Sequence, residues 1–355
     1  MKYKLSDIVE VTMGQSPKSE FYNNEGKGYP FLQGNRTFGF KRPTFDTYTT
    51  VMTKLAKAGD IIMSVRAPVG DLNITPVDMC LGRGVCSLRM KNENQEFLFY
   101  LMKYVMPQLL SKESGTIFGS VNRNDINALE VDIPSDEETQ RKIARFLTMI
   151  DDKIELNMTI NNNLLEQAQA LYTSMFISDA DPTWRQGHLS DLITVRYGKD
   201  HKKLADGAYP VYGSGGIMRY AERPLYDRES VLIPRKGTLN NVMYVNEPFW
   251  SVDTMFYTEM RMPNVAKYVY HFVKSKDLAS LNAGSAVPSM TTEILNAMEL
   301  LIPSESALAK FEDIVAPMYK AMKDNDIQVA QLVKLRDTLL PKLMSGEVDV
   351  SAIEI

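Results

Sequence analysis

The sequence predicts an α+β fold in which two similar mixed α/β domains are separated by two long helices that form an antiparallel coiled coil. Two observations support this prediction. Residues 115–135 and 284–304 are copies of an internal repeat at a constant offset of 169 positions. After each copy, apolar residues recur at the alternating steps of three and four that are typical of a coiled-coil seam. This pattern predicts two halves related by a pseudo-twofold axis.

The two halves share their ends and differ in the middle. The segments GTIFGSVNRNDINALEVDIPS and GSAVPSMTTEILNAMELLIPS are identical at eight of 21 positions. The beginnings match as well, since LSD at 5–7, followed by Val11 and Gly14, returns as LSD at 189–191, followed by Val195 and Gly198. Between these ends the similarity fades, although the apolar run before Arg66 resembles the run before Arg235. We expect one structural frame with two different interiors.

Composition places the chain among ordinary globular proteins. It has 355 residues, 44% hydrophobic and 24% charged, and no run of roughly 18 apolar residues that could span a membrane. Asp7 and Glu10 stand where a signal peptide would be apolar, so we expect a cytoplasmic protein. Cys80 and Cys86 are the only cysteines, and with three scattered histidines they offer no zinc spacing. We therefore expect two buried thiols and no metal.

The net charge of -4 is unevenly distributed. Residues 1–135 carry 16 basic and 14 acidic side chains, and residues 179–304 carry 14 of each. Residues 136–178 and 305–355 each carry an excess of three acidic side chains. The acidic excess therefore lies in the two segments with helical periodicity, and the two domains are near neutral.

Four segments follow from these patterns: a first domain at 1–135, a long helix at 136–178, a second domain at 179–304, and a second long helix with a C-terminal tail at 305–355. Both domains contain short β-like runs between Gly, Pro and Asn residues. Ser135 and Glu138 have the spacing of a capping box, which predicts that the first helix begins near residue 136.

Polar residues interrupt both helical seams. Asn157 and Asn161 lie in the first seam and Asn325 in the second. Polar seam residues fix the register of a coiled coil at a cost in stability. Only an antiparallel pair brings the equivalent midpoints together, so we predict that Asn157 or Asn161 faces Asn325.

The order of domain, helix, domain and helix resembles the specificity subunit of type I restriction-modification systems. The resemblance rests on GDIIMSVRAPVG at 59–70, IPSDEETQ at 133–140 and LRDTLLPKLMSGEV at 335–348. It implies two target recognition domains that each read half of a split double-stranded DNA site. It also implies a coiled coil that spaces the domains and docks two methyltransferase subunits, within an assembly that recruits motor-nuclease subunits. The chain itself would perform no chemistry, and S-adenosylmethionine, Mg and ATP would bind the partner subunits.

Candidate DNA contacts are forked donors, amides and cations beside Gly- or Pro-containing loops. In the first domain they are Gln33, Asn35, Arg36, Arg66, Arg83, Asn122 and Arg123. In the second domain they are Lys199, His201, Lys202, Lys203, Ser214, Arg219, Arg235, Lys236, Asn240 and Asn241. The alternatives are an ordinary turn at 33–36, an N-cap for the loop at 120–124, and a solvated charge run at 199–203.

Other residues resemble the motifs of competing functions. Asn246-Glu247-Pro248-Phe249 departs from the adenine-methyltransferase motif at Glu247, and the glycine run at 213–216 lacks the surroundings of a nucleotide site. A scaffold that binds protein or glycan partners is the alternative to DNA recognition. The apolar stretch at 339–344 is our candidate methyltransferase contact.

Overall fold

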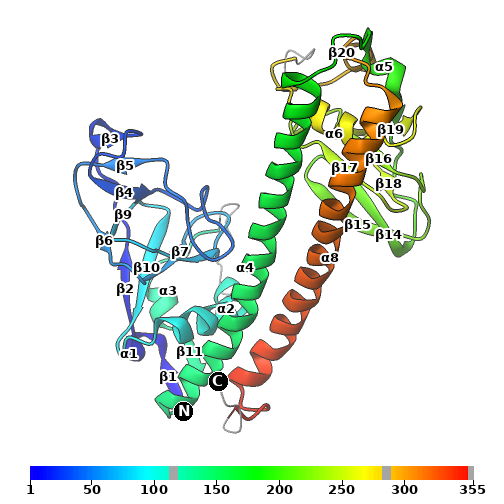
Figure 1. Ribbon diagram of the computed structural model, residues 1–355. Coiled ribbons are helices and arrows are strands. Elements are labelled where there is room, and N and C mark those ends of the chain that lie inside the picture. Colours follow the sequence, from blue (N-terminus) through cyan, green and yellow to red (C-terminus); the bar gives the residue numbers. More distant parts are fainter. Residues whose placement is uncertain (112–118, 282–288, 351–355) are drawn as a thin grey trace. The chain divides into compact units, whose positions relative to one another are not determined.

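A computed structural model describes residues 1–111, 119–281 and 289–350 (Figure 1). The first residues of both repeat copies, 115–118 and 284–288, lie outside the described residues. The chain divides into two compact units, Met1–Thr159 with Asn325–Ile355, and Ile160–Asp324. Each unit combines one globule with part of both long helices.

The first unit contains three sheets. The strand orders are β1 (Lys2–Lys4) with β11 (Glu130–Asp132); β2 (Val9–Met13), β10 (Val85–Met90), β7 (Ile61–Ser64) and β8 (Leu72–Ile74); and β3 (Tyr22–Asn23), β5 (Tyr48–Thr49), β4 (Tyr29–Leu32), β9 (Met79–Leu81) and β6 (Leu55–Ala56). Among these pairs only β4 and β9 are parallel. The helical elements are α1 (Leu5–Ile8), η1 (Ser19–Phe21), α2 (Gln95–Ser111), α3 (Arg123–Asn127), and parts of α4 (Glu137–Thr173) and α8 (Glu305–Met344).

The second unit repeats this plan. The strand orders are β12 (Gln186–His188) with β20 (Glu299–Leu301); β13 (Ile193–Tyr197), β19 (Met255–Met260), β16 (Ser230–Pro234) and β17 (Met243–Val245); and β15 (Gly216–Ala221), β14 (Asp206–Gly213) and β18 (Trp250–Ser251). Here too only one pair, β14 with β18, is parallel. The remaining helical elements are η2 (Ser174–Ser178), α5 (Leu189–Leu192), α6 (Ala266–Lys274) and α7 (Thr292–Asn296).

The structural repeat extends into the interiors where the sequences diverge. Both four-stranded sheets have the same connectivity, and each globule contains one parallel strand pair at the corresponding place. Backbone hydrogen bonds form these ladders, and a ladder does not require particular side chains. The frame is therefore common to both units even though most interior residues differ.

Each globule shares its core with the long helices. In the first unit Ile61, Leu88 and Phe97 pack in one cluster with Ile143 of α4 and Leu343 of α8. The equivalent core of the second unit includes Phe176 and Phe311, whose ring centroids lie 5.2 Å apart. Burial on this scale makes the helices part of each domain, because an isolated amphipathic helix could not cover its apolar face.

The beginning of α4 differs from the predicted capping box. Asp136, and not Ser135, accepts hydrogen bonds from the backbone N–H groups of Glu138 at 3.3 Å and Thr139 at 2.8 Å. The hydroxyl of Thr139 donates to the same carboxylate, and these bonds lower the pKa of Asp136. The capping-box prediction was wrong because the aspartate lies one residue closer to the free N–H groups and carries the charge that a helix N-terminus favours.

The two long helices run in opposite directions within each unit. In the first unit, Asn157 Nδ2 donates to Gln328 Oε1 at 2.6 Å, and Arg336 donates to Asp151 at 2.8 Å. Residue numbers thus rise along α4 as they fall along α8. In the second unit, Asn161 Nδ2 donates to the carbonyl oxygen of Met322 at 3.1 Å. Contact of either asparagine with Asn325 stays a prediction.

The apolar stretch at 339–344 does not form the predicted partner surface. Leu340, Leu343 and Met344 are buried and belong to the core of the first unit. The prediction was wrong because this end of α8 covers the globule as well as α4, and so needs two apolar faces. Both cysteines are free and buried, as expected, and burial raises the pKa of Cys86 to about 12.

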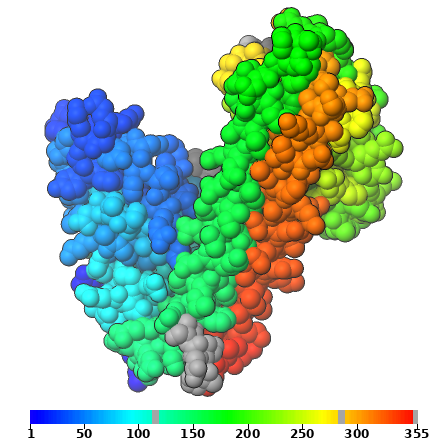
Figure 2. Space-filling model, in the orientation of Figure 1, coloured from blue at the N-terminus to red at the C-terminus, as the bar shows by residue number. Residues whose placement is uncertain are grey.

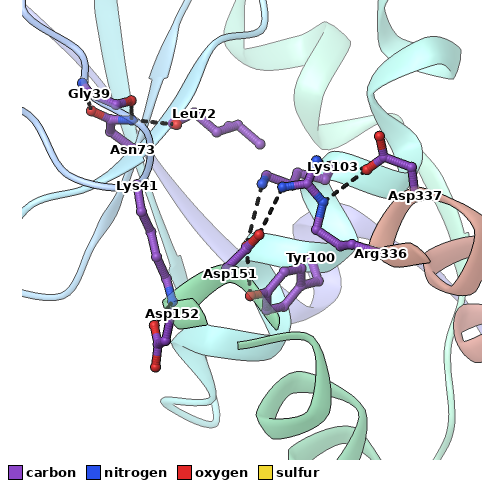
Figure 3. Close-up of polar contacts among 10 residues, drawn as sticks. All are labelled: Gly39, Lys41, Leu72, Asn73, Tyr100, Lys103, Asp151, Asp152, Arg336 and Asp337. Atoms are coloured by element: carbon purple, nitrogen blue, oxygen red, sulfur yellow. Dashed lines mark hydrogen bonds and ion pairs between the residues drawn. The ribbon is translucent and has the colours of Figure 1, made fainter. Parts of the chain in front are cut away.

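A buried carboxylate joins α2, α4 and α8 in the first unit (Figure 3). Asp151 is fully buried and accepts hydrogen bonds from the Tyr100 hydroxyl at 2.9 Å and Arg336 Nη1 at 2.8 Å. Lys103 Nζ lies 3.7 Å from the same carboxylate, and burial lowers its pKa. Arg336 also pairs with Asp337 at the surface. The carboxylate is thus surrounded by donors from two other helices.

A loop of the first globule is tied to α4 beside this network. Asn73 Nδ2 donates to the Gly39 carbonyl oxygen at 3.0 Å, and Gly39 N–H donates to Asn73 Oδ1 at 3.0 Å. The nearby Lys41 is almost fully buried, and its Nζ lies 3.2 Å from Asp152 (Figure 3). The loop therefore has a fixed position on the helix.

Replacing Asp151 with Asn should lower the free energy of unfolding of the first unit by about 3 to 5 kcal/mol, because two partly buried cations lose their countercharge. The matched control is Asp337→Asn, at an exposed carboxylate that contacts the same arginine. It should cost no more than about 1 kcal/mol. Hydrogen exchange of α2 amides with increasing denaturant measures both. Equal effects of the two variants would contradict this role for Asp151.

A buried neutral histidine joins the three corresponding helices of the second unit. His271 of α6 is fully buried, with Nδ1 2.8 Å from Gln169 Oε1 on α4 and Nε2 2.9 Å from the Tyr319 hydroxyl on α8. One acceptor and one donor suit a neutral ring that carries its proton on Nδ1. Burial lowers the pKa of His271 to about 4.

Stability of the second unit should fall as the pH decreases from about 6.5 towards 4. In this window the unfolded chain binds a proton at His271 that the folded chain excludes, so acid favours unfolding, by up to about 3 kcal/mol. Trp184 and Trp250, the two tryptophans of the chain, both lie in this unit, so their fluorescence reports its denaturation. The His271→Gln variant should have a flatter profile over pH 6.5 to 5. An identical slope in the variant would assign the effect to other groups.

Candidate nucleic-acid interface

Backbone hydrogen bonds gather several loops of the first globule into one cluster, which we call loop cluster 1 and define as residues 14–16, 33–36, 65–66, 82–84 and 120. The Gly82 N–H donates to Leu32 O at 2.8 Å and the Gly84 N–H donates to Gln33 O at 2.9 Å. The Val65 N–H donates to Gly84 O at 2.9 Å. Three predicted residues, Gln33, Arg66 and Arg83, are thereby brought together at the ends of strands far apart in sequence.

The side chains of loop cluster 1 differ in availability. Gln33, Arg66 and Arg83 are exposed, and their side chains have no polar partner among the residues described. Arg36 instead forms a two-pronged ion pair with Asp46, with both N–O distances 2.8 Å. Asn35 Nδ2 donates to Asp71 Oδ2 at 2.5 Å. Cations without a partner can bind phosphates or bases directly, whereas Arg36 could do so only after its ion pair with Asp46 is broken.

The two residues predicted just before the closing strand have local roles. Asn122 is the N-cap of α3, where its side chain accepts from the backbone N–H groups of Asn124 and Asp125. Arg123 Nη2 donates to Val11 O at 2.8 Å. The structure thus agrees with the cap as the alternative to DNA contact for Asn122.

The second globule gathers a matching set of loops, which we call loop cluster 2 and define as residues 197–203, 213–216, 235–241 and 252–254. The Val252 N–H donates to Tyr212 O at 3.1 Å, and the Arg235 N–H donates to Thr254 O at 2.9 Å. Asn241 Nδ2 donates to Ser214 O at 2.8 Å. The two backbone bonds repeat the Gly82–Leu32 and Val65–Gly84 bonds of loop cluster 1.

This pattern corrects one alignment made from sequence. Isolated bridges join Arg66 to Ser120 and Lys236 to Ser289, so the residue corresponding to Arg66 is Lys236. Arg235 corresponds to the buried Val65, since the two share the same backbone hydrogen bond. The two strands end at the equivalent residues Ser64 and Pro234, so an alignment of the apolar runs that pairs the two arginines is shifted by one residue.

Some side chains in and near loop cluster 2 also form hydrogen bonds within the protein, and others are exposed. Lys199, Lys202, Lys203 and Lys236 are exposed, and their ammonium groups have no partner within the described part of the chain. Asn240 is held by Asp277 and by the Ala279 N–H. Outside the cluster, Arg219 donates to Leu204 O and Asp206. His201 is half-buried, and its Nδ1 has no partner in the described structure. The lysines form the cationic part of this surface.

Sequence reasoning missed three residues of these clusters. Ser16 Oγ accepts from the Arg83 N–H at 3.1 Å. Asp253 lies exposed on the turn where loop cluster 1 has Arg83, and Tyr197 lies under the Arg235 guanidinium. The repeated glycines that follow Met13 and Tyr197 were a usable signal for this edge of the sheet.

Those glycines allow the chain to pass close to the neighbouring turn. A Cβ atom on Gly14 would lie 2.0 Å from Gly82 O, and one on Gly198 would lie 2.0 Å from Val252 O. Real atoms do not approach so closely, so both positions require glycine. This requirement explains why these residues recur at the same place in both halves.

Gly198→Ala should therefore shift the turn at 252–254 and destabilise the second unit by about 1 to 3 kcal/mol. Gly215→Ala is the matched control in the same cluster, since its Cβ would have nothing within 4 Å. The control should change stability by about 0.5 kcal/mol or less. Tryptophan-monitored denaturation of both variants decides the matter. A neutral Gly198→Ala would show that the turn moves freely.

Neither a metal centre nor a membrane span is found in the described residues. They contain no group of three or more His, Cys, Asp or Glu placed to hold a metal ion. None of their helices combines the length and hydropathy that crossing a bilayer requires.

The family described as "Type I restriction modification DNA specificity domain" matches residues 1–166 and 182–321, one range for each globule. The chain belongs to this family. Its resemblance to specificity subunits is thereby confirmed, and the two matched ranges fit the repeated frame of the two units.

Several proteins similar to this chain are named specificity subunits of type I restriction enzymes. A putative type I restriction enzyme MjaX specificity subunit of Methanocaldococcus jannaschii is 40% identical over 149 residues, which are 41% of this chain and 35% of the relative. The chain thus spans about a third of that relative in this match. The MjaIX specificity subunit of the same organism is 25% identical over 99% of this chain and 94% of the relative. The HindI specificity subunit of Haemophilus influenzae is 23% identical over 83% and 88%.

A solved structure agrees with the fold. The S subunit of a type I restriction-modification system from M. genitalium aligns over 97% of this chain and 96% of that chain, with a TM-score of 0.63 and 18% sequence identity. At this identity the likeness supports the mixed α/β fold and leaves the side chains of the loop clusters to be judged from this chain alone.

Proposed function

We propose that this chain is the DNA-sequence-specificity subunit of a type I restriction-modification complex, and that each globule reads one half of a bipartite site. The observation that carries the proposal is the pair of loop clusters, which have the same backbone connections and different side chains. Arg83 in the first corresponds to Asp253 in the second, and Arg66 corresponds to Lys236. Two loop clusters with the same backbone and different side chains suit the recognition of two different half-sites.

The residue types in the clusters suit DNA. Arginine recognises guanine, glutamine recognises adenine, and lysine or arginine binds phosphate. The free side chains at Gln33, Arg66 and Arg83 in the first unit, and at Lys199 and Lys236 in the second, supply these groups. Since the globules are near neutral, partner subunits would provide much of the salt-dependent phosphate affinity.

The long helices would hold the two readers at a fixed distance. Opposite chain directions of α4 and α8 within each unit support one continuous antiparallel coiled coil with a pseudo-twofold axis. At 1.5 Å per residue, helices of 37 and 40 residues are roughly 55 to 60 Å long. One DNA turn between half-sites, about 34 to 36 Å, is well within this length.

The same helices are the proposed docking site for two methyltransferase subunits. In each unit α4 and α8 lie side by side with part of their surface exposed (Figure 2). Large apolar side chains are exposed there in the first unit, at Met149 and Leu156 on α4 and at Ile327 and Leu335 on α8. Exposed apolar side chains that lie together are typical of a contact surface, so we propose these four as part of it. They replace the buried stretch at 339–344 as our candidates.

This assignment leaves the chemistry to the partners. We propose that methyltransferase and motor-nuclease subunits bind S-adenosylmethionine, Mg and ATP, and that this chain contributes recognition alone, in the cytoplasm. Because the family match spans both globules, it favours DNA recognition over a protein- or glycan-binding scaffold.

Co-expression with the methyltransferase subunit of the same host, followed by methylome sequencing, tests the function and the spacing together. The unaltered chain should direct methylation to a split motif. Inserting seven residues into both α4 and α8 at their midpoints should lengthen the unread spacer by roughly three base pairs, because seven helical residues add about 10.5 Å. Both half-sites should stay unchanged.

An insertion into one helix alone is the control, because it shifts the register of one helix against the other by one heptad. The contacts that each globule makes with both helices then cannot all form, and methylation should be abolished. A changed half-site with an unchanged spacer would contradict the spacing role. Absence of any split motif with the unaltered chain would contradict the proposed function.

A further inference from the structure

Arg235 is held in a fixed orientation at the edge of loop cluster 2. Its backbone N–H donates to Thr254 O at 2.9 Å, and its carbonyl oxygen accepts from the Met290 N–H at 2.9 Å. Its Nη1 donates to the carbonyl oxygen of Asp253 at 3.0 Å. The guanidinium carbon lies 5.4 Å from the centre of the Tyr197 ring, within the range of a cation–π contact.

The ring under this arginine is itself fixed. Tyr197 ends β13, pairs in register with Phe256 of β19, and packs edge-on against that buried ring at 5.0 Å. The following residue, Gly198, fits only as glycine against Val252 O. Tyr197 is nevertheless 53% exposed, so its side chain is accessible to solvent. A rigid aromatic platform therefore carries the guanidinium at the protein surface.

The unused edge of this guanidinium is a paired donor. Nε and Nη2 of Arg235 contact no acceptor in the described ranges, so two parallel N–H groups remain for an external partner. Arg36 differs, because a carboxylate occupies its fork. Arg66 and Lys236 differ too, because nothing described here orients their charged ends. Among these cations, Arg235 alone has both an orientation and a free fork.

We propose that Arg235 reads a guanine in the half-site contacted by the second unit, with Tyr197 and the carbonyl oxygen of Asp253 as positioning groups. This inference rests on the proposed function. Two parallel donors from an arginine match the O6 and N7 acceptors of guanine in the major groove. Because the side chain is already oriented, binding costs little of its rotamer entropy.

A neighbouring charge favours a base over a phosphate as the partner. The carboxylate of Asp253 is exposed on the turn that orients Arg235, and no described residue pairs with it. A carboxylate repels phosphate but accepts a hydrogen bond from the amino group of cytosine, the partner base of guanine. The lysines of loop cluster 2 carry compact charges without a forked pair of donors, and suit phosphate.

At the equivalent positions, which the structure describes, the first unit has neither the arginine nor the tyrosine of this device. Val65 stands at the position of Arg235 and is buried, and Met13 stands at the position of Tyr197. Recognition of guanine by this device is therefore confined to one of the two half-sites. The other half-site is an internal control for every substitution.

The test is methylome sequencing of cells that express the methyltransferase complex with this chain or its Arg235→Ala variant. One guanine of one half-site should lose its preference by roughly 5- to 150-fold, as loss of a bidentate base contact implies. The half-site contacted by the first unit should not change. Arg235→Lys should also lose the preference, because an ammonium group cannot form the paired contact.

Variants of the platform separate positioning from folding. Tyr197→Phe keeps the ring and should preserve the guanine preference, whereas Tyr197→Leu should weaken it. Lys236→Ala should reduce methylation of all sites together and leave the motif intact, as loss of a phosphate contact does.

The inference is overturned if Arg235→Ala lowers methylation uniformly without widening any position, or if Tyr197→Leu behaves as Tyr197→Phe does. It is also overturned if neither half-site contains a guanine. These outcomes still show a split motif with the unaltered chain, so they are distinct from failure of the proposed function, in which no such motif exists.

Discussion

The burial of polar side chains where each globule meets its two helices is the constraint on which the rest of the structure depends. Asp151 can be buried only because Tyr100 and Arg336 reach it from two other helices. In the other unit the uncharged His271 of α6 joins the three corresponding helices, with its ring between Gln169 of α4 and Tyr319 of α8. Unsatisfied groups at these depths would be costly, so each globule has one stable seating on its helices. Fixed seating is what a reader of spaced half-sites requires.

Charged residues near the middle of the two helices favour the correct pairing of each globule with its helix. Arg42 of the first globule lies 3.4 Å from Glu155 of α4, and Glu247 of the second lies 3.2 Å from Lys323 of α8. Positions 155 and 323 are 168 residues apart, as are Asn157 and Asn325, so the two pairs are equivalent with reversed signs. Exposed ion pairs add little stability. A globule on the wrong helix would instead face a like charge, which is how repulsion creates specificity between similar partners.

The sequence was sufficient for features that depend on local periodicity or on the repeat. It predicted both long helices, the repeated ends and the recurrent glycines, because these follow from spacing alone. It could not show that Arg36 is neutralised by Asp46 or that Leu343 covers a globule, because both depend on contacts across the chain. Tyr197 was missed for the same reason. The sequence could predict the residue types and loops of the candidate site. It could not predict which of their side chains already have partners within the protein.

The two loop clusters separate what holds the fold from what would read DNA. Carbonyl oxygens, N–H groups and Gly14 or Gly198 form the turns in both units, and none of these depends on side chains that reach the surface. The same position can therefore hold Arg83 in the first unit and Asp253 in the second, or Met13 in the first and Tyr197 in the second, without loss of the frame. A backbone that tolerates such exchange can acquire new side chains for a new half-site while the helices keep the spacing. Because the frame fixes where each side chain begins, a single oriented residue such as Arg235 is enough to change which base is preferred.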